Sequence, residues 1–191
     1  MSIYVKQAGT WHEIPSGGGG LSGLGGWADI SDPPTSTYTD SAGEKWNVWT
    51  FNADGTLNVS KEGLLDVLIL GGGGGADANI ANGGPGSWII GTQKIPAGAQ
   101  PVVVGVGGVG GGGSFNTTPY FGKASSLAGI TTGWSSIYNA AMPGLTSSIT
   151  GTTVTYGQGQ SPAPRPNHGD GGKGHTAETG SAGVVIVRRP A

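Results

Sequence analysis

The stretch Leu64-Leu65-Asp66-Val67-Leu68-Ile69-Leu70, followed at once by the glycine block 71–75, decides the fold. The first part is an almost wholly apolar run broken only by Asp66, which is typical of a strand that is buried on both faces or lies in a sandwich core. The second part has no side chains to bury. The sequence therefore predicts a buried strand that passes directly into a glycine block.

Other short apolar runs, separated by turn signals, predict strands on both sides of this stretch. The Asp54-Gly55 pair predicts a hairpin turn, because glycine adopts positive φ at little cost. No segment of more than a few residues shows a helical period of apolar positions. We expect an all-β fold, an antiparallel β-sandwich of jelly-roll type with glycine-rich loops. The expected strands are 45–51, 56–60, 64–70, 87–91, 93–95, 101–106 and 183–189.

Glycine accounts for 41 of the 191 residues, and the blocks 71–75 and 110–113 come soon after predicted strands. Three interpretations of these blocks remain open. They are loops gathered at one end of a sheet, or sites where backbones approach closely at a sheet corner or symmetry axis. The third interpretation is packed extended helices of the polyproline II type.

The N-terminal region predicts a separate small unit. Residues 1–14 read as a β-hairpin that anchors the protein, and residues 15–26 form a glycine-rich linker with a reach of roughly 20 Å. The glycine-rich β domain then spans residues 27–191. An isolated hairpin is marginal in water, so we expect this one to dock on a partner. The candidate anchor residues are Tyr4, Val5, Trp11 and Ile14.

Composition argues against several functional classes. Nine Lys and Arg stand against eleven Asp and Glu, which leaves no basic footprint for nucleic acid. No run of about 18 apolar residues predicts membrane insertion, and the N-terminus has no signal-peptide pattern. Charged residues make up 10% of the chain, against roughly 25% in typical soluble domains. A chain this poor in charge stays soluble more easily within a large assembly.

The sequence matches to catalytic and cofactor-binding motifs are incomplete. Residues 105–110 match G-x-G-x-x-G, but no helix and no acidic ribose partner follow them. The group His168, Asp170 and His175 has metal-binding residue types, although Asn-His and Asp-Gly pairs are also typical of a polar surface loop. We favour the surface loop, and we expect no enzymatic activity, no cofactor and no metal.

Aromatic and polar residues in the less regular part of the domain are candidates for ligand contact. Aromatic side chains on β-loops stack on sugar rings or form contact hot spots between proteins, and they also pack in cores and subunit interfaces. The candidate ligand-facing loop residues are Tyr120, Trp134, Tyr138, Asn139, His168 and Asp170.

Four features in order resemble the glycine-rich domain of bacteriophage minor tail and tail-fibre proteins. They are the hairpin 46–59, the strand and glycine block 65–75, the segment 103–115 and the ending 180–188. The segment Val5-Lys6-Gln7-Ala8-Gly9-Thr10-Trp11 is also similar to a short hairpin of phage tail proteins.

The resemblance implies a virion protein, made in the host cytoplasm, at the tail tip or in a fibre. Its expected partners are other tail proteins and a host cell-surface glycan or protein, and its expected state is a homotrimer. A head fibre or capsid decoration protein is the alternative. The resemblance carries over no catalytic residues.

Overall fold

A computed structural model describes residues 3–7, 10–14, 26–76, 82–111, 121–135, 137–138, 143–159, 161, 163–173 and 178–191. Every regular element in these ranges is a strand, so the all-β prediction is confirmed. The strands are β1 (Ile3–Gln7), β2 (Thr10–Ile14), β3 (Asp29–Ile30), β4 (Ser36–Thr39), β5 (Lys45–Phe51), β6 (Gly55–Lys61), β7 (Gly63–Leu70), β8 (Asn82–Gly83), β9 (Trp88–Ile95), β10 (Gly98–Val103), β11 (Ser126–Leu127), β12 (Ile130–Thr131), β13 (Ile137–Tyr138), β14 (Leu145–Ser147), β15 (Val154–Tyr156) and β16 (Val184–Pro190).

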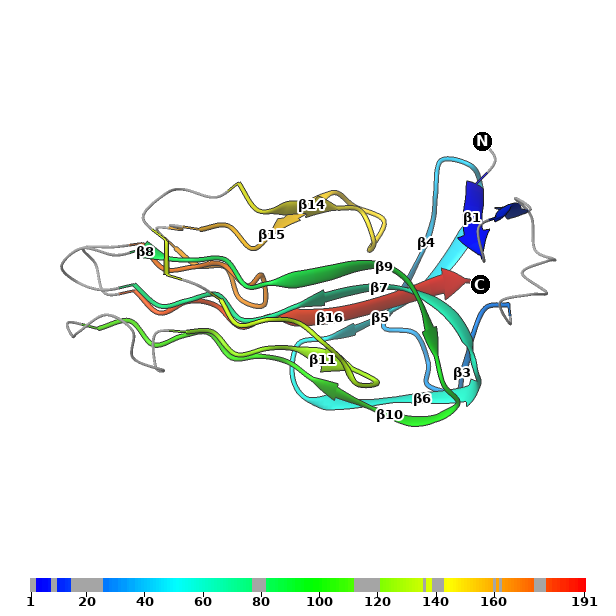
Figure 1. The fold of residues 1–191 in the computed structure, drawn as a ribbon, viewed down its shortest axis with the longest axis horizontal. Coiled ribbons are helices and arrows are strands. Elements are labelled where there is room, and N and C mark those ends of the chain that lie inside the picture. Colours follow the sequence, from blue (N-terminus) through cyan, green and yellow to red (C-terminus); the bar gives the residue numbers. More distant parts are fainter. Residues whose placement is uncertain are drawn as a thin grey trace.

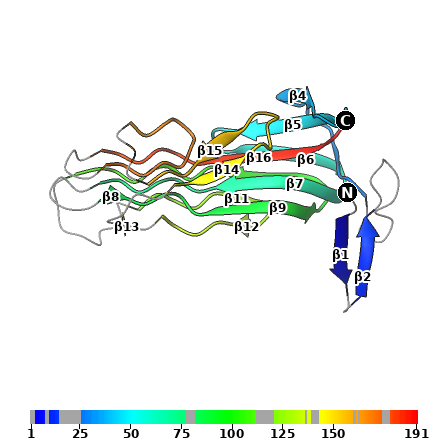
Figure 2. The same ribbon diagram turned by 90° about the horizontal axis from the view of Figure 1, so that it is seen from above.

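Two five-stranded antiparallel sheets form a sandwich at one end of the domain (Figures 1 and 2). The first sheet has the order β4-β5-β16-β7-β9, and the second has the order β12-β11-β10-β6-β3. The C-terminal strand β16 lies between β5 and β7, so the end of the chain closes the centre of the first sheet. The order of the strands along the chain does not predict this insertion, because β16 is far in sequence from both β5 and β7.

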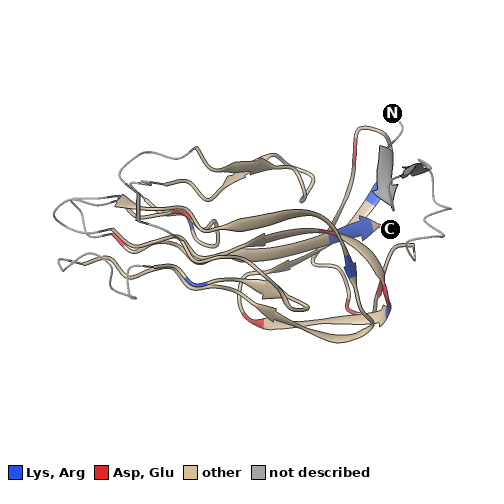
Figure 3. Ribbon diagram, in the orientation of Figure 1, with Lys and Arg blue, Asp and Glu red and all other residues tan. Residues whose placement is uncertain are grey.

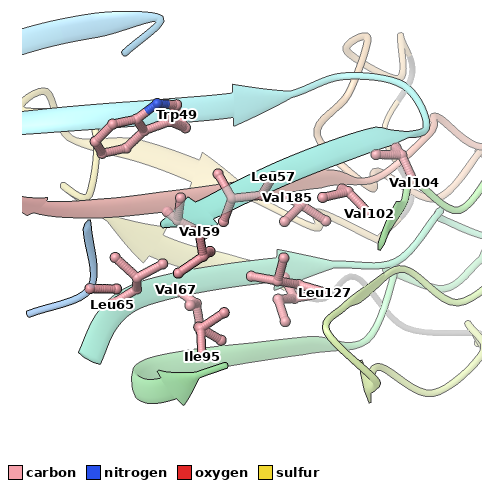
Figure 4. Packing of buried hydrophobic residues seen from close by; sticks show 13 residues of the cluster. Trp49, Leu57, Val59, Leu65, Val67, Ile95, Val102, Val104, Leu127 and Val185 are labelled. Atoms are coloured by element: carbon pink, nitrogen blue, oxygen red, sulfur yellow. The ribbon is translucent and has the colours of Figure 1, made fainter. Parts of the chain in front are cut away.

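The core between the sheets is made of alternating residues from the facing strands (Figure 4). Leu65, Val67 and Ile69 point inward from β7 and meet Leu57 and Val59 of β6. Each such side chain contributes about 1.5–3 kcal/mol when it leaves water. This side-chain core is what holds the sandwich together.

The other face of the first sheet is covered by the β14–β15 hairpin. Leu68 and Leu70 alternate with the inner residues of β7 and pack with Ile149 and Tyr156 in a second cluster. Strand β7 is therefore buried on both faces, which is one of the two alternatives that its largely apolar sequence predicts. Only Asp66 in this run is partly exposed.

Strand boundaries differ from the sequence prediction in informative places. The segments 87–91 and 93–95 form one strand, β9, which passes through Gly91 at a φ of +143°. The strand expected at 101–106 begins earlier and ends at Val103, where the glycine pattern takes over. The hairpin expected in residues 1–14 is present as β1 and β2, paired from Ile3↔Ile14 to Gln7↔Thr10.

Beyond the sandwich, the glycine segments continue the strands as extended segments that lie side by side (Figure 1). We call this array the glycine bundle. Its central segment, 71–76, follows β7 directly, and segments that adjoin β9, β10, β11 and β16 surround it. The bundle consists of residues 71–76, 83–87, 104–111, 121–125, 169–172 and 178–183.

Successive residues of the central segment donate hydrogen bonds in three different directions. The N–H groups of Gly71, Gly72 and Gly73 donate to carbonyls of Ser87, Lys123 and Ser181, which lie on three different segments. Three residues on, the directions repeat, because Gly74 donates to Gly84 and Ala76 donates to Glu178. A period of three with no internal hydrogen bonds is the signature of the polyproline II helix.

Burial along the segment 104–111 follows the same period. Gly105 and Gly108 are buried, whereas Val106 and Val109 are 61% and 58% exposed. From residue 105 to residue 109, valine side chains therefore occur at the outward positions, and glycine occurs at the positions that face another backbone.

Close contact between backbones explains why these inward positions are glycine. A Cβ on Gly73 would lie 2.1 Å from the carbonyl oxygen of Asp170, and one on Gly72 would lie 2.1 Å from that of Val106. Real Cβ atoms essentially never come closer than 3.0 Å to another heavy atom. Of the three interpretations, the described part of the glycine blocks matches packed polyproline-II-type helices, and the expected glycine-rich loops are instead ordered there.

Candidate functional site

The expected anchor residues lie on the N-terminal hairpin. Tyr4 and Val5 are on β1, and Trp11 and Ile14 are on β2. The register pairs Tyr4 with Glu13, and Lys6 with Trp11. The hairpin is therefore a paired unit of its own, and its role as an anchor stays a prediction.

The expected ligand-facing residues are distributed over different parts of the fold. Tyr120 and Asn139 lie outside the described residues, and Tyr138 lies in β13, paired with Asn82. Trp134 is 55% exposed beside the glycine bundle, and the Lys123 ammonium lies 4.7 Å from the centre of its ring. Of this set, Trp134 is the aromatic side chain that the structure shows open to solvent.

His168 lies against the β14–β15 hairpin and is half-buried. Its ring stacks on Tyr156 at 5.4 Å between ring centres, and its Nδ1 lies 2.6 Å from the carbonyl oxygen of Pro166. Burial raises the pKa of the Tyr156 hydroxyl above its ordinary value. This stacked pair packs the segment that carries His168 against the β14–β15 hairpin, and the expected ligand-facing role of His168 stays a prediction.

Asp170 is fully buried, which corrects the expectation of a ligand-facing loop residue. Its two carboxylate oxygens accept hydrogen bonds from the Arg165 guanidinium at 2.9 and 3.0 Å, and its Oδ1 also accepts from the backbone N–H of Gln158 at 2.9 Å. A buried carboxylate needs such partners, because an unpaired one is costly to desolvate. Asp170 therefore has a structural role.

The Arg165–Asp170 pair joins the β14–β15 hairpin to the glycine bundle. Arg165 also donates to the carbonyl of Thr155 in β15 at 2.7 Å. The backbone N–H of Asp170 donates to the hydroxyl of Ser181, on a neighbouring bundle segment, at 2.7 Å. His175, the third member of the metal-binding pattern, lies outside the described residues, and the described part of the chain contains no group of three potential metal-ligating side chains.

A groove lies on the outer face of the first sheet, beside the end of the β14–β15 hairpin. It has a volume of about 350 Å³. Its floor is formed by Asp66 of β7 and Arg188 of β16, and its walls include Ile90 and Ile149. Exposed hydroxyl-bearing residues, among them Thr146, line its rim.

Three adjacent strands place the polar floor in one row. The register pairs Arg188 with Asp66, and Asp66 with Thr92. Arg188 Nε donates to Asp66 Oδ2 at 3.1 Å, and the Thr92 hydroxyl donates to Asp66 Oδ1 at 2.6 Å. The side chains of Arg188 and Asp66 are 24% and 20% exposed, so the pair is mostly shielded yet reaches the groove.

Aromatic residues hold Arg188 from the other side. Its guanidinium lies 4.3 Å from the ring centre of Trp46, and one of its terminal nitrogens donates to the Tyr38 hydroxyl. The Tyr38 and Trp46 rings are stacked at 6.4 Å between centres. These contacts fix the guanidinium in one orientation.

Sequence reasoning did not find this groove. The available signal was the single carboxylate of Asp66 within an apolar strand, because a partly buried charge requires a partner. The partner, Arg188, is 122 residues away in the sequence.

Comparison with known proteins adds no family. The sequence matches no family model, and a search among curated proteins finds no relative.

Within the described ranges, no helix is long and apolar enough to cross a membrane. Among the described residues, charged residues lie mainly along the strands and turns of the sandwich end, and few lie along the glycine bundle (Figure 3).

Proposed function

We propose that this protein is a structural protein of a bacteriophage virion, a minor tail protein at the tail tip or in a fibre, that takes part in host attachment. The observation that carries the proposal is the glycine bundle, which extends the sandwich strands as ordered, backbone-packed chains. We expect such a bundle to be a stiff projection, because many of its backbone N–H groups, such as those of Gly71, Gly72 and Gly73, donate to carbonyls of neighbouring segments.

The bundle also has an aromatic side chain open to solvent beside it. Trp134 is 55% exposed, and the Lys123 ammonium lies 4.7 Å from the centre of its ring. Tyr120, another of the expected ligand-facing residues, lies outside the described residues. Exposed aromatic side chains are common contact points for sugars and for partner proteins.

The ordered resemblance to phage glycine-rich domains supports the same role. In this proposal the hairpin of residues 1–14 binds another tail protein, and the domain binds a host-surface glycan or protein. The assembly is a homotrimer. The proposal assigns no catalytic step, cofactor or nucleic-acid contact to the protein.

The test is incorporation into virions. A phage that encodes the protein without residues 1–14 is expected to assemble particles that lack it, while the purified variant keeps the circular dichroism of the full chain. Native mass spectrometry is expected to give three times the chain mass of 18.9 kDa. Normal incorporation of the variant would remove the anchor claim.

Antibody labelling of virions then separates tail from head. Label at the tail tip or on fibres supports the proposal. Label on the capsid would replace it with the head-fibre or decoration role, and absence of label from virions would overturn both.

A further inference from the structure

We propose that the groove over Asp66 and Arg188 binds a neutral saccharide. The inference rests on the proposed attachment role for its biological meaning, and it names the ligand class. The groove lies on the outer face of the first sheet, and none of the residues that line it is among those that the sequence predicts to face a ligand.

The charge of the floor determines which ligands fit. Asp66 and Arg188 neutralise each other at 3.1 Å, and the described residues that line the groove include no other charged side chain. An ionic ligand would have to break this pair and would leave the other charge without its partner in a shielded position. A neutral polar ligand leaves the pair intact.

The hydrogen-bonding capacity of the pair suits hydroxyl groups. An ionised carboxylate has about four acceptor positions, and the described contacts of Asp66 are one bond from Arg188 and one from Thr92. Arg188 has five N–H donors, of which one reaches Asp66 and one reaches Tyr38. Neighbouring sugar hydroxyls donate to one such group and accept from the other at the same time.

The walls and the size of the groove match a sugar ring. Ile90 is 49% exposed and offers apolar surface for the C–H face of a sugar, whereas Ile149, which also lines the groove, is only 5% exposed. The rim residues Thr146 and Ser148 are exposed and supply further hydroxyls. The volume of about 350 Å³ lies at the lower end of small-molecule sites, which corresponds to one or two sugar units.

The floor is also fixed before a ligand arrives. The cation–π contact with Trp46 and the bonds to Tyr38 and Asp66 hold Arg188 from three sides. A floor that is already ordered loses little conformational entropy on binding.

The experiment measures binding of the full chain to an array of immobilised neutral and acidic saccharides, followed by calorimetry with the best neutral ligand. Thr146→Trp is expected to fill the groove from its exposed rim and to abolish binding. Asp66→Asn is expected to weaken binding about tenfold or more, because a charge-assisted acceptor is lost. Thr56→Trp, an exposed threonine on β6 of the other sheet, is the matched control and is expected to bind normally.

Three results would overturn the proposal. They are the absence of neutral saccharide binding, binding of acidic saccharides alone, and neutral saccharide binding that Thr146→Trp leaves unchanged in a folded variant. Its failure is distinct from failure of the proposed function. If virions carry the protein at the tail and the protein binds no saccharide on the array, the saccharide site alone is refuted. Groove-dependent saccharide binding by a protein that is absent from virions refutes the virion role alone.

Discussion

The segments of the glycine bundle are continuous with strands of the sandwich, yet the two parts are stabilised by different interactions. In the sandwich, residues such as Leu65 and Leu57 fill the space between sheets, and stability comes from apolar side chains leaving water. In the bundle, Gly72 and Gly73 leave no space to fill, and neighbouring backbones are in contact. Its stability comes from hydrogen bonds between segments of the same chain, each worth about 1 kcal/mol net, and from close backbone packing.

This difference shows that a polypeptide can change its packing mode from one residue to the next, at the end of a strand. Strand β7 ends at Leu70, and the next residue, Gly71, already donates to another segment in the three-fold pattern. The sandwich loses stability when atoms are removed from its core, and the bundle loses stability when atoms are added. The following substitutions test that contrast.

The largest effect is expected from adding one methyl group to the centre of the bundle. Gly73→Ala places Cβ 2.1 Å from the carbonyl oxygen of Asp170, a backbone atom that no side-chain rotation can move away. We expect a loss of about 4 kcal/mol or more, above the 1–3 kcal/mol of ordinary overpacking. Urea unfolding and hydrogen exchange of the amides of residues 71–76 measure it.

Gly133→Ala is the matched control, because its Cβ would meet the Ser87 hydroxyl, a side-chain atom, at 3.1 Å. It is expected to change stability by less than about 1 kcal/mol. Equal stability of the two variants would contradict backbone-to-backbone packing in the bundle.

The second effect is the removal of atoms from the sandwich. Leu65→Ala deletes a side chain with no exposed surface, and we expect a loss of about 3 kcal/mol from lost burial and the cavity that remains. Ile90→Ala, at a position 49% exposed, is expected to cost about 0.5 kcal/mol or less. The comparison is made by urea unfolding, and a Leu65→Ala variant as stable as Ile90→Ala would show that the sandwich core carries little of the stability.

The smallest effect is expected at the junction between the β14–β15 hairpin, which covers the sandwich, and the bundle. Asp170→Asn removes the charge that pairs with Arg165, and we expect a loss of about 1–2 kcal/mol, because the Arg165 side chain is 38% exposed and partly screened by water. Glu62→Gln breaks the exposed pair with Lys94 and serves as the control, with an expected change below about 0.5 kcal/mol. Thermal unfolding at neutral pH compares the variants, and equal midpoints would mean that the junction pair is dispensable.

Much of the sandwich could be predicted from the sequence, because its strands are local patterns. The alternation in Thr56-Leu57-Asn58-Val59 and the run 64–70 each carry their own signal of burial. The short strands β3, β11 and β12 were missed, because two residues show no pattern. The expectation that Asp170 faces a ligand was wrong, because its burial depends on Arg165 and on a neighbouring segment.

The sequence by itself determined that the protein is all-β, that the run 64–70 is a buried strand and that a glycine block follows it. Only the tertiary structure decided what the glycine blocks are. A run such as 71–75 is equally compatible with a loop or an extended helix, because a polyproline II helix has no internal hydrogen bonds to favour it locally. Its partners, Ser87, Lys123 and Ser181, come from distant parts of the chain, and only the assembled sandwich brings them to one axis.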